Sequence, residues 1–145
     1  MRKIKFRTWD TINKEFSEWT NRDPFFDTSH GKIFFWERTK KSDGSYGGDI
    51  ILEDIKDRFI LQQYTGLKDR NGTEIYEGDI ITLTSNDGLD YNGEVVYYPF
   101  FAHYGVSMER THLTYDWIQP LHEVWSAAYT EIVGNIFQNP ELLKA

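Results

Sequence analysis

The stretch Gln63-Tyr-Thr-Gly-Leu-Lys-Asp-Arg-Asn-Gly-Thr-Glu-Ile-Tyr-Glu-Gly-Asp-Ile-Ile81 contains the features that decide the fold. It combines a tight Asn71-Gly72 turn with a second turn at residues 77–79 and the start of an apolar strand. Asn and Gly tolerate the positive φ angles that tight hairpin turns require. The Gly78-Asp79 pair before an apolar strand resembles the opening of an SH3-like small barrel, where the glycine bends the chain into the barrel. The stretch therefore predicts the joint of a small β domain, with glycines placed for backbone conformation and Tyr76 as a core anchor.

Alternation of polar and apolar residues predicts strands on both sides of this joint. In the first of them we expect Ile4 and Phe6 to face the core, and Gly134 in the last predicts a bulge or a close backbone approach. A polar Ser/Asp/Gly-rich loop is expected over Lys40–Gly48. The predicted strands cover residues 3–8, 15–19, 32–37, 49–53, 59–64, 79–84, 93–98 and 130–137.

Helical signals are confined to the last part of the chain. Leu121, Val124, Trp125 and Ala128 recur at helical spacing after a proline, which predicts two turns of helix over 120–128. Asn139-Pro140 predicts one terminal turn. The expected fold is mainly β, with an SH3-like small barrel in the second half, additional N-terminal strands and one or two short helices near the C-terminus. We expect a single domain over residues 1–145, which can be subdivided into 1–58 and 59–145.

Composition narrows the classes of protein to which the chain can belong. Hydrophobic residues make up 39% and aromatic residues 17%, which is enough for a buried core. The chain has no cysteine, which excludes disulfides and cysteine-based zinc sites and fits a reducing, cytoplasmic compartment. The basic start is not followed by an apolar run, so we expect no export signal, and no stretch approaches the roughly 20 apolar residues of a membrane span.

Charge is unevenly distributed along the chain. The net charge is −7; residues 1–70 hold 14 basic and 12 acidic side chains, and residues 71–145 hold 2 basic and 11 acidic ones. Binding to phosphate groups requires clustered Lys and Arg. The acidic second half is therefore a poor surface for general nucleic-acid binding.

Three blocks of sequence carry a family resemblance. They are Lys5–Asp10 near the start, Gln63–Ile81 in the middle and Ile132–Leu143 at the end. Together they resemble the YopX family, small proteins encoded by bacteriophages and prophages. The resemblance spans the chain and implies a mainly β fold, but it carries no catalytic or ligand-binding residues. The segments Lys40–Gly48 and Pro99–Ala128 depart from the family pattern, so a lineage-specific function is expected there.

The residues that could support catalysis do not form a recognisable pattern. The four histidines lie at positions 30, 103, 112 and 122 without the spacing of a metal motif, and no nucleophile elbow is present. Acidic pairs such as Glu53-Asp54 are more often solvated than catalytic. We therefore predict a non-enzymatic protein with no cofactor and no metal.

Aromatic residues between Tyr97 and Trp117 are the best candidates for a functional surface. Exposed aromatic side chains without basic neighbours more often form protein interfaces than nucleic-acid sites. We therefore predict a protein–protein interaction or self-assembling module whose partner is another copy, a host protein or a phage protein. The candidate contact residues are Tyr98, Phe100, Tyr104 and Trp117.

The alternative is a phage factor associated with nucleic acid. It would bind through the basic N-terminal strand and a second basic cluster, because electrostatic attraction dominates such binding. The candidate contacts are Arg2, Lys3, Lys5, Arg7, Arg38, Lys40 and Lys41.

Overall fold

The structure, a computed structural model, describes residues 3–16, 24–27, 32–40, 42–51, 59–84, 88–108 and 118–143. Its chain forms two compact units: the first contains Met1–Arg7 and Gln62–Ala145, and the second contains Thr8–Leu61. The second unit is thus inserted into the sequence of the first. Strands β1 (Phe6–Asp10) and β6 (Phe59–Lys68) contain the two points at which the chain passes from one unit to the other. Both units are mainly β.

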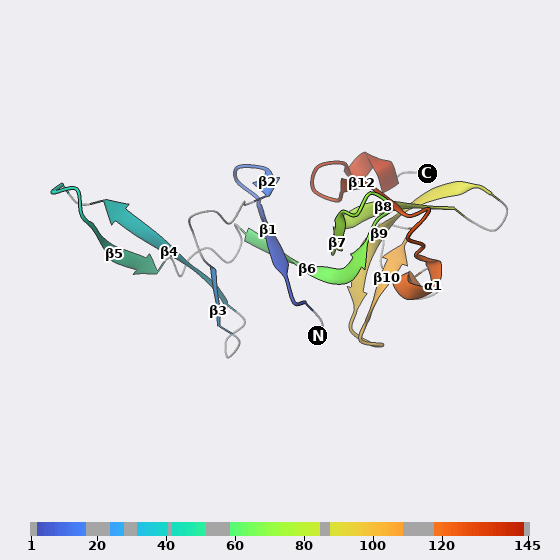
Figure 1. Ribbon diagram of the computed structural model, residues 1–145, viewed down its shortest axis with the longest axis horizontal. Helices are drawn as coiled ribbons and strands as arrows, with labels where there is room; N and C mark the ends of the chain where they lie inside the picture. Colours follow the sequence, from blue (N-terminus) through green and yellow to red (C-terminus); the bar gives the residue numbers. More distant parts are fainter. Residues whose placement is uncertain are drawn as a thin grey trace. The chain divides into compact units, whose positions relative to one another are not determined.

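A five-stranded antiparallel sheet forms most of the first unit, with the strand order β11-β10-β9-β8-β12 (Figure 1). Strand β7 precedes it in the chain and pairs with β6, and short helices flank its last strand in sequence. The bounds are β7 Glu74–Tyr76, β8 Asp79–Thr84, β9 Asp90–Tyr98, β10 His103–Ser107, β11 Ile118–Pro120, α1 Leu121–Val124, β12 Glu131–Asn135 and the 3-10 helix η2 Pro140–Leu143.

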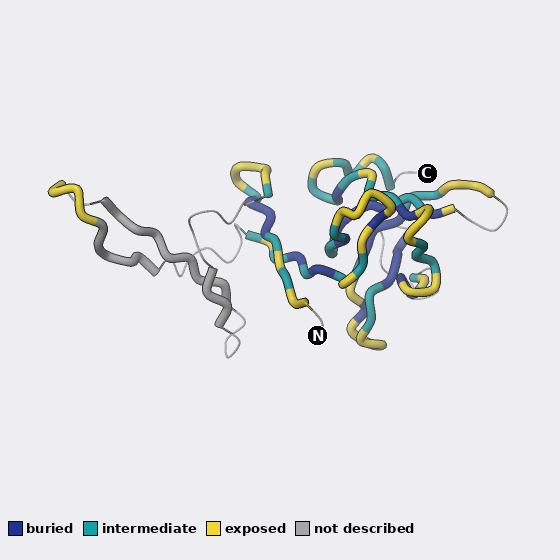
Figure 2. The backbone as a smooth tube through the Cα atoms, in the orientation of Figure 1, coloured by how far each residue is buried: buried dark blue, intermediate teal, exposed yellow. Residues whose placement is uncertain are grey.

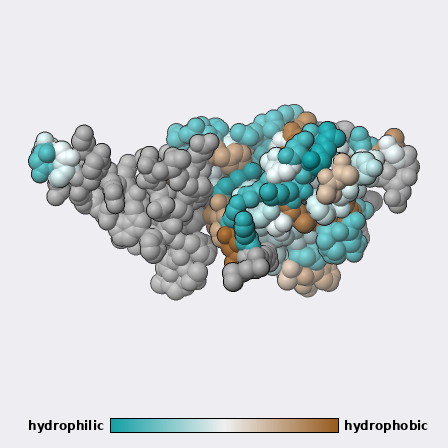
Figure 3. All heavy atoms as spheres, viewed as in Figure 1, coloured by the Kyte–Doolittle hydropathy of each residue, from teal (hydrophilic) through white to brown (hydrophobic). Residues whose placement is uncertain are grey.

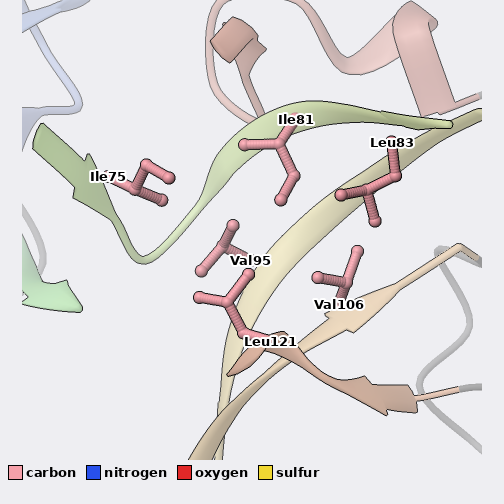
Figure 4. Packing of buried hydrophobic residues seen from close by; sticks show 6 residues of the cluster. All are labelled: Ile75, Ile81, Leu83, Val95, Val106 and Leu121. Carbon is pink, nitrogen blue, oxygen red and sulfur yellow. The ribbon is translucent and has the colours of Figure 1, made fainter. Parts of the chain in front are cut away.

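The core of the first unit follows from the register of this sheet. Ile81 pairs with Gly93 and Val95 pairs with Val106, so side chains two residues apart along β8, β9 and β10 share one face. Figure 2 shows buried residues along these central strands. The core cluster consists of Ile75, Ile81, Leu83, Val95, Val106 and Leu121, which point toward one another in Figure 4. Each such side chain contributes about 1.5–3 kcal/mol when it is fully buried.

The second unit contains a short hairpin and a three-stranded antiparallel sheet in the order β3-β4-β5. In the hairpin, Trp9 of β1 pairs with Phe16 of β2 (Glu15–Phe16), and their ring centroids lie 5.0 Å apart. The Asp10 carboxylate accepts the backbone N–H groups of Ile12 and Asn13 at 2.9 and 3.0 Å. The sheet strands are β3 Pro24–Asp27, β4 Lys32–Lys40 and β5 Tyr46–Ile51.

The predicted mainly β fold is confirmed, and so is the irregularity at Gly134. The pairing of β12 with β8 shifts register between Ile132 and Gly134. A Cβ atom at Gly134 would lie 2.7 Å from Asn139 Oδ1, so the chain also approaches itself closely there. The prediction that Ile4 and Phe6 face the core is wrong: they are 69% and 38% exposed.

The helix predicted over 120–128 is shorter in the structure. It ends at Val124, and Trp125 has extended backbone dihedrals. The indole Nε1 of Trp125 donates to the Lys68 carbonyl at 2.9 Å, which ties this residue to the end of β6. The helix therefore ends where Trp125 forms this tertiary hydrogen bond, although apolar residues continue at helical spacing beyond Val124.

Candidate functional site

A buried polar network connects the start, middle and end of the first unit's sequence. Arg7 donates through Nε to Gln62 Oε1 at 2.8 Å and through Nη2 to Asp79 Oδ1. Asn135 Nδ2 donates to the same two acceptors, at 3.4 Å to Gln62 and 3.3 Å to Asp79. Gln62, Asp79 and Asn135 are each no more than 3% exposed. Such a network constrains the strands that supply its members, because an unpaired polar group is costly when buried.

The charge of the Asp79 carboxylate is compensated by the Arg7 guanidinium and by a backbone N–H group. Burial raises the pKa of Asp79 above its ordinary value, while Arg7 and the Tyr76 backbone N–H act in the opposite direction. The Arg7 guanidinium carbon also lies 4.7 Å from the centroid of the Tyr76 ring. Burial, with the hydrogen bond to Glu74, raises the pKa of Tyr76 to about 12. Tyr76 therefore remains a neutral hydrogen-bond donor at physiological pH.

The turn after β6 is organised by one buried carboxylate. Asp69 is 5% exposed; its Oδ1 accepts the N–H groups of Asn71 and Thr73 at 2.9 and 2.8 Å, and its Oδ2 accepts that of Ile132 at 3.3 Å. Burial alone would raise the pKa of Asp69, but these donors together hold the pKa below its ordinary value. Arg70 forms an ion pair with Glu131 beside it. These charged groups therefore attach the turn to β12 within the same unit.

Aromatic side chains gather at the turn between β9 and β10. Phe100 is 79% exposed and Phe101 is 68% exposed, and the turn closes with Ala102 at a φ of 52°. The hairpin ends at the bottom of Figure 1, and an apolar projection occupies the same place in Figure 3. We call Tyr97, Tyr98, Phe100, Phe101 and His103 the aromatic hairpin tip.

Ring contacts organise the aromatic hairpin tip. The Phe101 ring lies 5.4 Å from that of Tyr98 and 6.0 Å from that of His103, measured between centroids, and the latter pair is nearly parallel at 16°. Next to these rings, the Tyr97 ring packs edge-on against the Tyr104 ring, with 5.3 Å between their centroids. Ring pairs at these separations are worth about 0.5–1.5 kcal/mol each beyond burial. The tip therefore presents exposed apolar surface in an ordered arrangement.

Comparison with known proteins places this architecture in a family. A model of the family described as YopX protein matches residues 5–144. The chain belongs to the YopX family. Among solved structures, this YopX-family chain is similar to protein EF1440 from Enterococcus faecalis, with a TM-score of 0.62 and 29% identity over 99% of this chain and 100% of that one. No curated protein matches the chain.

The buried network gives a physical role to the three YopX-like blocks. Arg7 belongs to the first block, Asp79 to the second and Asn135 to the third, while Gln62 directly precedes the second. The central block also supplies Ile75 to the core, whereas Tyr76, the expected core anchor, is only half-buried. Within the YopX-family chain, these blocks therefore hold the fold of the first unit together.

Gly78 of the central block has both a conformational and a steric reason to be glycine. Its φ is 75°, and a Cβ atom would lie 2.1 Å from Gln62 Nε2 and 3.3 Å from Ile136 Cγ1. Gly78→Ala is expected to lower the free energy of unfolding by about 2 kcal/mol, because it adds left-handed strain and displaces a buried amide. Chemical denaturation measures this loss. Gly72→Ala, with a φ of 82° and open space around it, is the matched control for strain alone, and equal losses in the two variants would contradict the steric part.

The predicted contact residues of the aromatic surface are only partly at the surface. Phe100 is exposed, Tyr104 is half-buried, Tyr98 is 9% exposed, and Trp117 lies outside the described residues. Phe101 was not among the predicted contacts. Strand alternation would turn one of two adjacent phenylalanines inward, but both lie in a turn, where that alternation does not apply.

The basic residues of the nucleic-acid hypothesis have several different environments. Lys3 is exposed, whereas Lys5 pairs with Glu74 and Arg7 is bound within the buried network. Arg38 and Lys40 lie on β4, and their side chains, like Arg2 and Lys41, are outside the described part of the structure. Of the described basic side chains in this set, two therefore satisfy intramolecular acceptors.

Two further findings concern the described residues alone. No group of three or more His, Cys, Asp or Glu side chains there is positioned to hold a metal ion. No helix in the same part of the chain has the length and apolarity needed to cross a membrane.

Proposed function

We propose that this YopX-family protein is a non-enzymatic protein–protein interaction or self-assembling module that acts in the cytoplasm of a bacterium carrying a phage or prophage. It contacts its partner through the aromatic hairpin tip. The partner is a second copy of the chain, a host protein or a phage protein. We further infer that the sheet of the first unit is an SH3-like small barrel, and the bend at Gly78 followed by the β8-β9-β10 meander supports this architecture.

The exposure of two adjacent phenylalanines carries the functional proposal. Phe100 and Phe101 project from a hairpin turn, and the surrounding segment 95–108 contains no Asp, Glu, Lys or Arg. The rest of the acidic half of the chain is rich in carboxylates, so this segment stands out as an uncharged apolar surface. Interfaces are enriched in aromatic side chains and depleted of charge at their centre.

Self-association is the first form of this function to test. Light scattering over a range of concentrations is expected to show a rise in mass for the natural chain. Phe100→Ser and Phe101→Ser are each expected to weaken association by about tenfold or more, since buried aromatic contacts dominate interfaces. Tyr129→Ser is the matched control, because Tyr129 is a 68% exposed aromatic residue outside the hairpin. Equal effects of all three substitutions would contradict a role for the tip.

A strict monomer at every concentration would remove self-association and leave a different protein as the partner. The same variants then serve in affinity capture from host cells. A partner retained by the natural chain and by Tyr129→Ser, but lost with Phe100→Ser, would support the proposal. A partner retained equally by all variants would argue against the tip as the contact surface.

Nucleic-acid binding is the weaker candidate. The Lys5 ammonium and the Arg7 guanidinium already satisfy Glu74 and Asp79. Binding of phosphate groups would have to compete with these intramolecular pairs. The exposed aromatic surface therefore favours the protein-interaction proposal.

A further inference from the structure

The sequence contains two Asn-Gly pairs in very different surroundings. Asn71-Gly72 lies in the exposed turn between β6 and β7, whereas Asn92-Gly93 lies within β9. Asparagine is a chemically labile residue, and glycine after it has no side chain to hinder attack of its backbone nitrogen on the asparagine amide carbon. The local chemistry of the two pairs is the same, so a difference in their reactivity has to come from the fold.

The surroundings of Gly72 leave room for this reaction. Both residues of the first pair are exposed, and a Cβ atom at Gly72 would meet no described atom within 4 Å. The side-chain amide of Asn71 donates to Glu131 Oε1 at 3.3 Å, a long contact at the surface. The Gly72 N–H donates to the Asp69 carbonyl at 3.0 Å. Reaction therefore waits on local opening of the turn, in which this N–H leaves its acceptor.

Contacts from three other elements hold the Asn92-Gly93 pair. The Asn92 side chain accepts from Thr82 Oγ1 of β8 at 2.7 Å and donates to the Leu142 carbonyl of η2 at 3.2 Å. A Cβ atom at Gly93 would lie 2.2 Å from Val106 Cγ1 of β10. The Asn92 amide therefore cannot turn toward the next nitrogen without breaking both hydrogen bonds, and the strand around it has no free space for a ring.

We propose that Asn71 is a site of spontaneous deamidation and that the sheet protects Asn92. The Gly72 nitrogen loses its proton to hydroxide and attacks Cγ of Asn71; the Cγ–Nδ2 bond breaks, and ammonia leaves with a proton from water. The resulting succinimide takes up one water molecule, which opens the ring on either side. The product is aspartate or isoaspartate at position 71, and the net reaction consumes water and releases ammonia.

Deamidation changes the charge where the turn is attached to β12. The new carboxylate replaces the amide that donates to Glu131, and Glu131 also forms an ion pair with Arg70. The two carboxylates then compete for the Arg70 guanidinium and repel each other. In isoaspartate the main chain runs through the side-chain carbon, which adds a methylene to the turn. Both products therefore weaken the attachment of the turn to β12.

Incubation of the full chain at mildly alkaline pH, followed by peptide mapping, tests this site, since base generates the attacking nitrogen. In native buffer we expect Asn71 to convert at least about tenfold faster than Asn92, because an exposed turn opens more readily than a paired strand. In concentrated urea the two rates should converge, since unfolding removes the protection. Water labelled with heavy oxygen should place one labelled atom in the new carboxyl group of either product.

Two variants connect the reaction to the turn. Asn71→Gln is expected to abolish it at position 71 and leave the slow rate at Asn92 unchanged, because glutamine would have to form a larger, less favourable ring. Asp69→Ala, verified as folded by circular dichroism, is expected to speed conversion of Asn71, since the turn loses a carboxylate that holds it closed.

Equal rates at Asn71 and Asn92 in native buffer would overturn the proposal, as would conversion of Asn71 in urea alone. The reaction involves no residue of the aromatic hairpin tip and is independent of the proposed function. Light scattering of Asn71→Asp, which carries the aspartate product, verifies this separation: association that depends on Phe100 should be unchanged in it.

Discussion

Replacing Arg7 by alanine is expected to lower the free energy of unfolding of the first unit by about 3–5 kcal/mol at neutral pH, the usual cost of removing one partner of a buried ion pair. The Asp79 side chain is only 2% exposed, and Arg7 is the cation that compensates its charge. The substitution also removes a donor from Gln62. Hydrogen exchange of amides in β8 and β12 measures the loss within this unit.

The loss in Arg7→Ala is expected to shrink as the pH falls. Burial already places the folded-state pKa of Asp79 above its ordinary value, and removal of Arg7 takes away the interaction that lowers it. A carboxyl group with a raised folded-state pKa favours folding when protonated, and that stability is lost as the pH rises through the raised pKa. A constant deficit from acidic to neutral pH would contradict this account.

Two further substitutions separate charge from packing in this network. Asp79→Asn in the Arg7→Ala background is expected to recover part of the stability, because it removes the uncompensated charge. Lys5→Ala is the matched control: Lys5 also pairs across the chain, but its side chain is 41% exposed. Exposed pairs of this kind contribute about 0–1 kcal/mol.

Asp69→Ala is expected to lower the free energy of unfolding by about 3 kcal/mol. It removes a charged acceptor from three backbone N–H groups, and a hydrogen bond to a charged group contributes about 1.5–3 kcal/mol. The substitution also detaches the turn after β6 from Ile132 in β12. Urea denaturation of the natural and variant chains measures the difference.

The pH dependence at Asp69 has the opposite sign to that at Asp79. The folded-state pKa of Asp69 lies below its ordinary value, so its contribution is present above the ordinary carboxyl range and is lost as the pH falls through the folded-state pKa. The gap between the natural chain and Asp69→Ala should therefore narrow in acid. Asp43→Ala is the control, since Asp43 forms a similar turn contact with Ser45 on the surface. A comparable loss in that variant would show that burial of the carboxylate is not what matters.

Local chemistry was sufficient to predict the turns and much of the strand pattern. Glycines with positive φ occur at Gly66, Gly72 and Gly78, as the central stretch predicts. Asp10 and Asp69 each accept backbone N–H groups of the turn that follows, in keeping with the similar Asp-and-Asn patterns of those two turns. These features depend on residues close together in the chain, so a single sequence contains the relevant information.

The first strand shows where local patterning failed. Its alternation places Ile4 and Phe6 on one face and Lys5 and Arg7 on the other, and hydrophobicity favours the first pair as the inner face. In the structure the basic pair is turned toward Glu74 and Asp79, with Tyr64 and Tyr76 beside the two cations. Acidic partners about 70 residues away in the sequence turn the basic face of the strand inward. The local alternation of polar and apolar residues contains no information about such distant partners.

The candidate surface divides in the same way. The sequence alone was enough to identify an aromatic, uncharged segment in an acidic half-chain and to predict an interface there. The folded conformation of this segment determines that Phe100 and Phe101 are exposed while Tyr98 is buried. The reason is that strand alternation ends at the turn, between Tyr98 and the two phenylalanines. Folding also brings His103 and His122 together, since β10 and α1 become neighbours only when the sheet folds. Local residue chemistry thus determines the turns, whereas the burial of a side chain and the identity of its partners depend on contacts between distant segments.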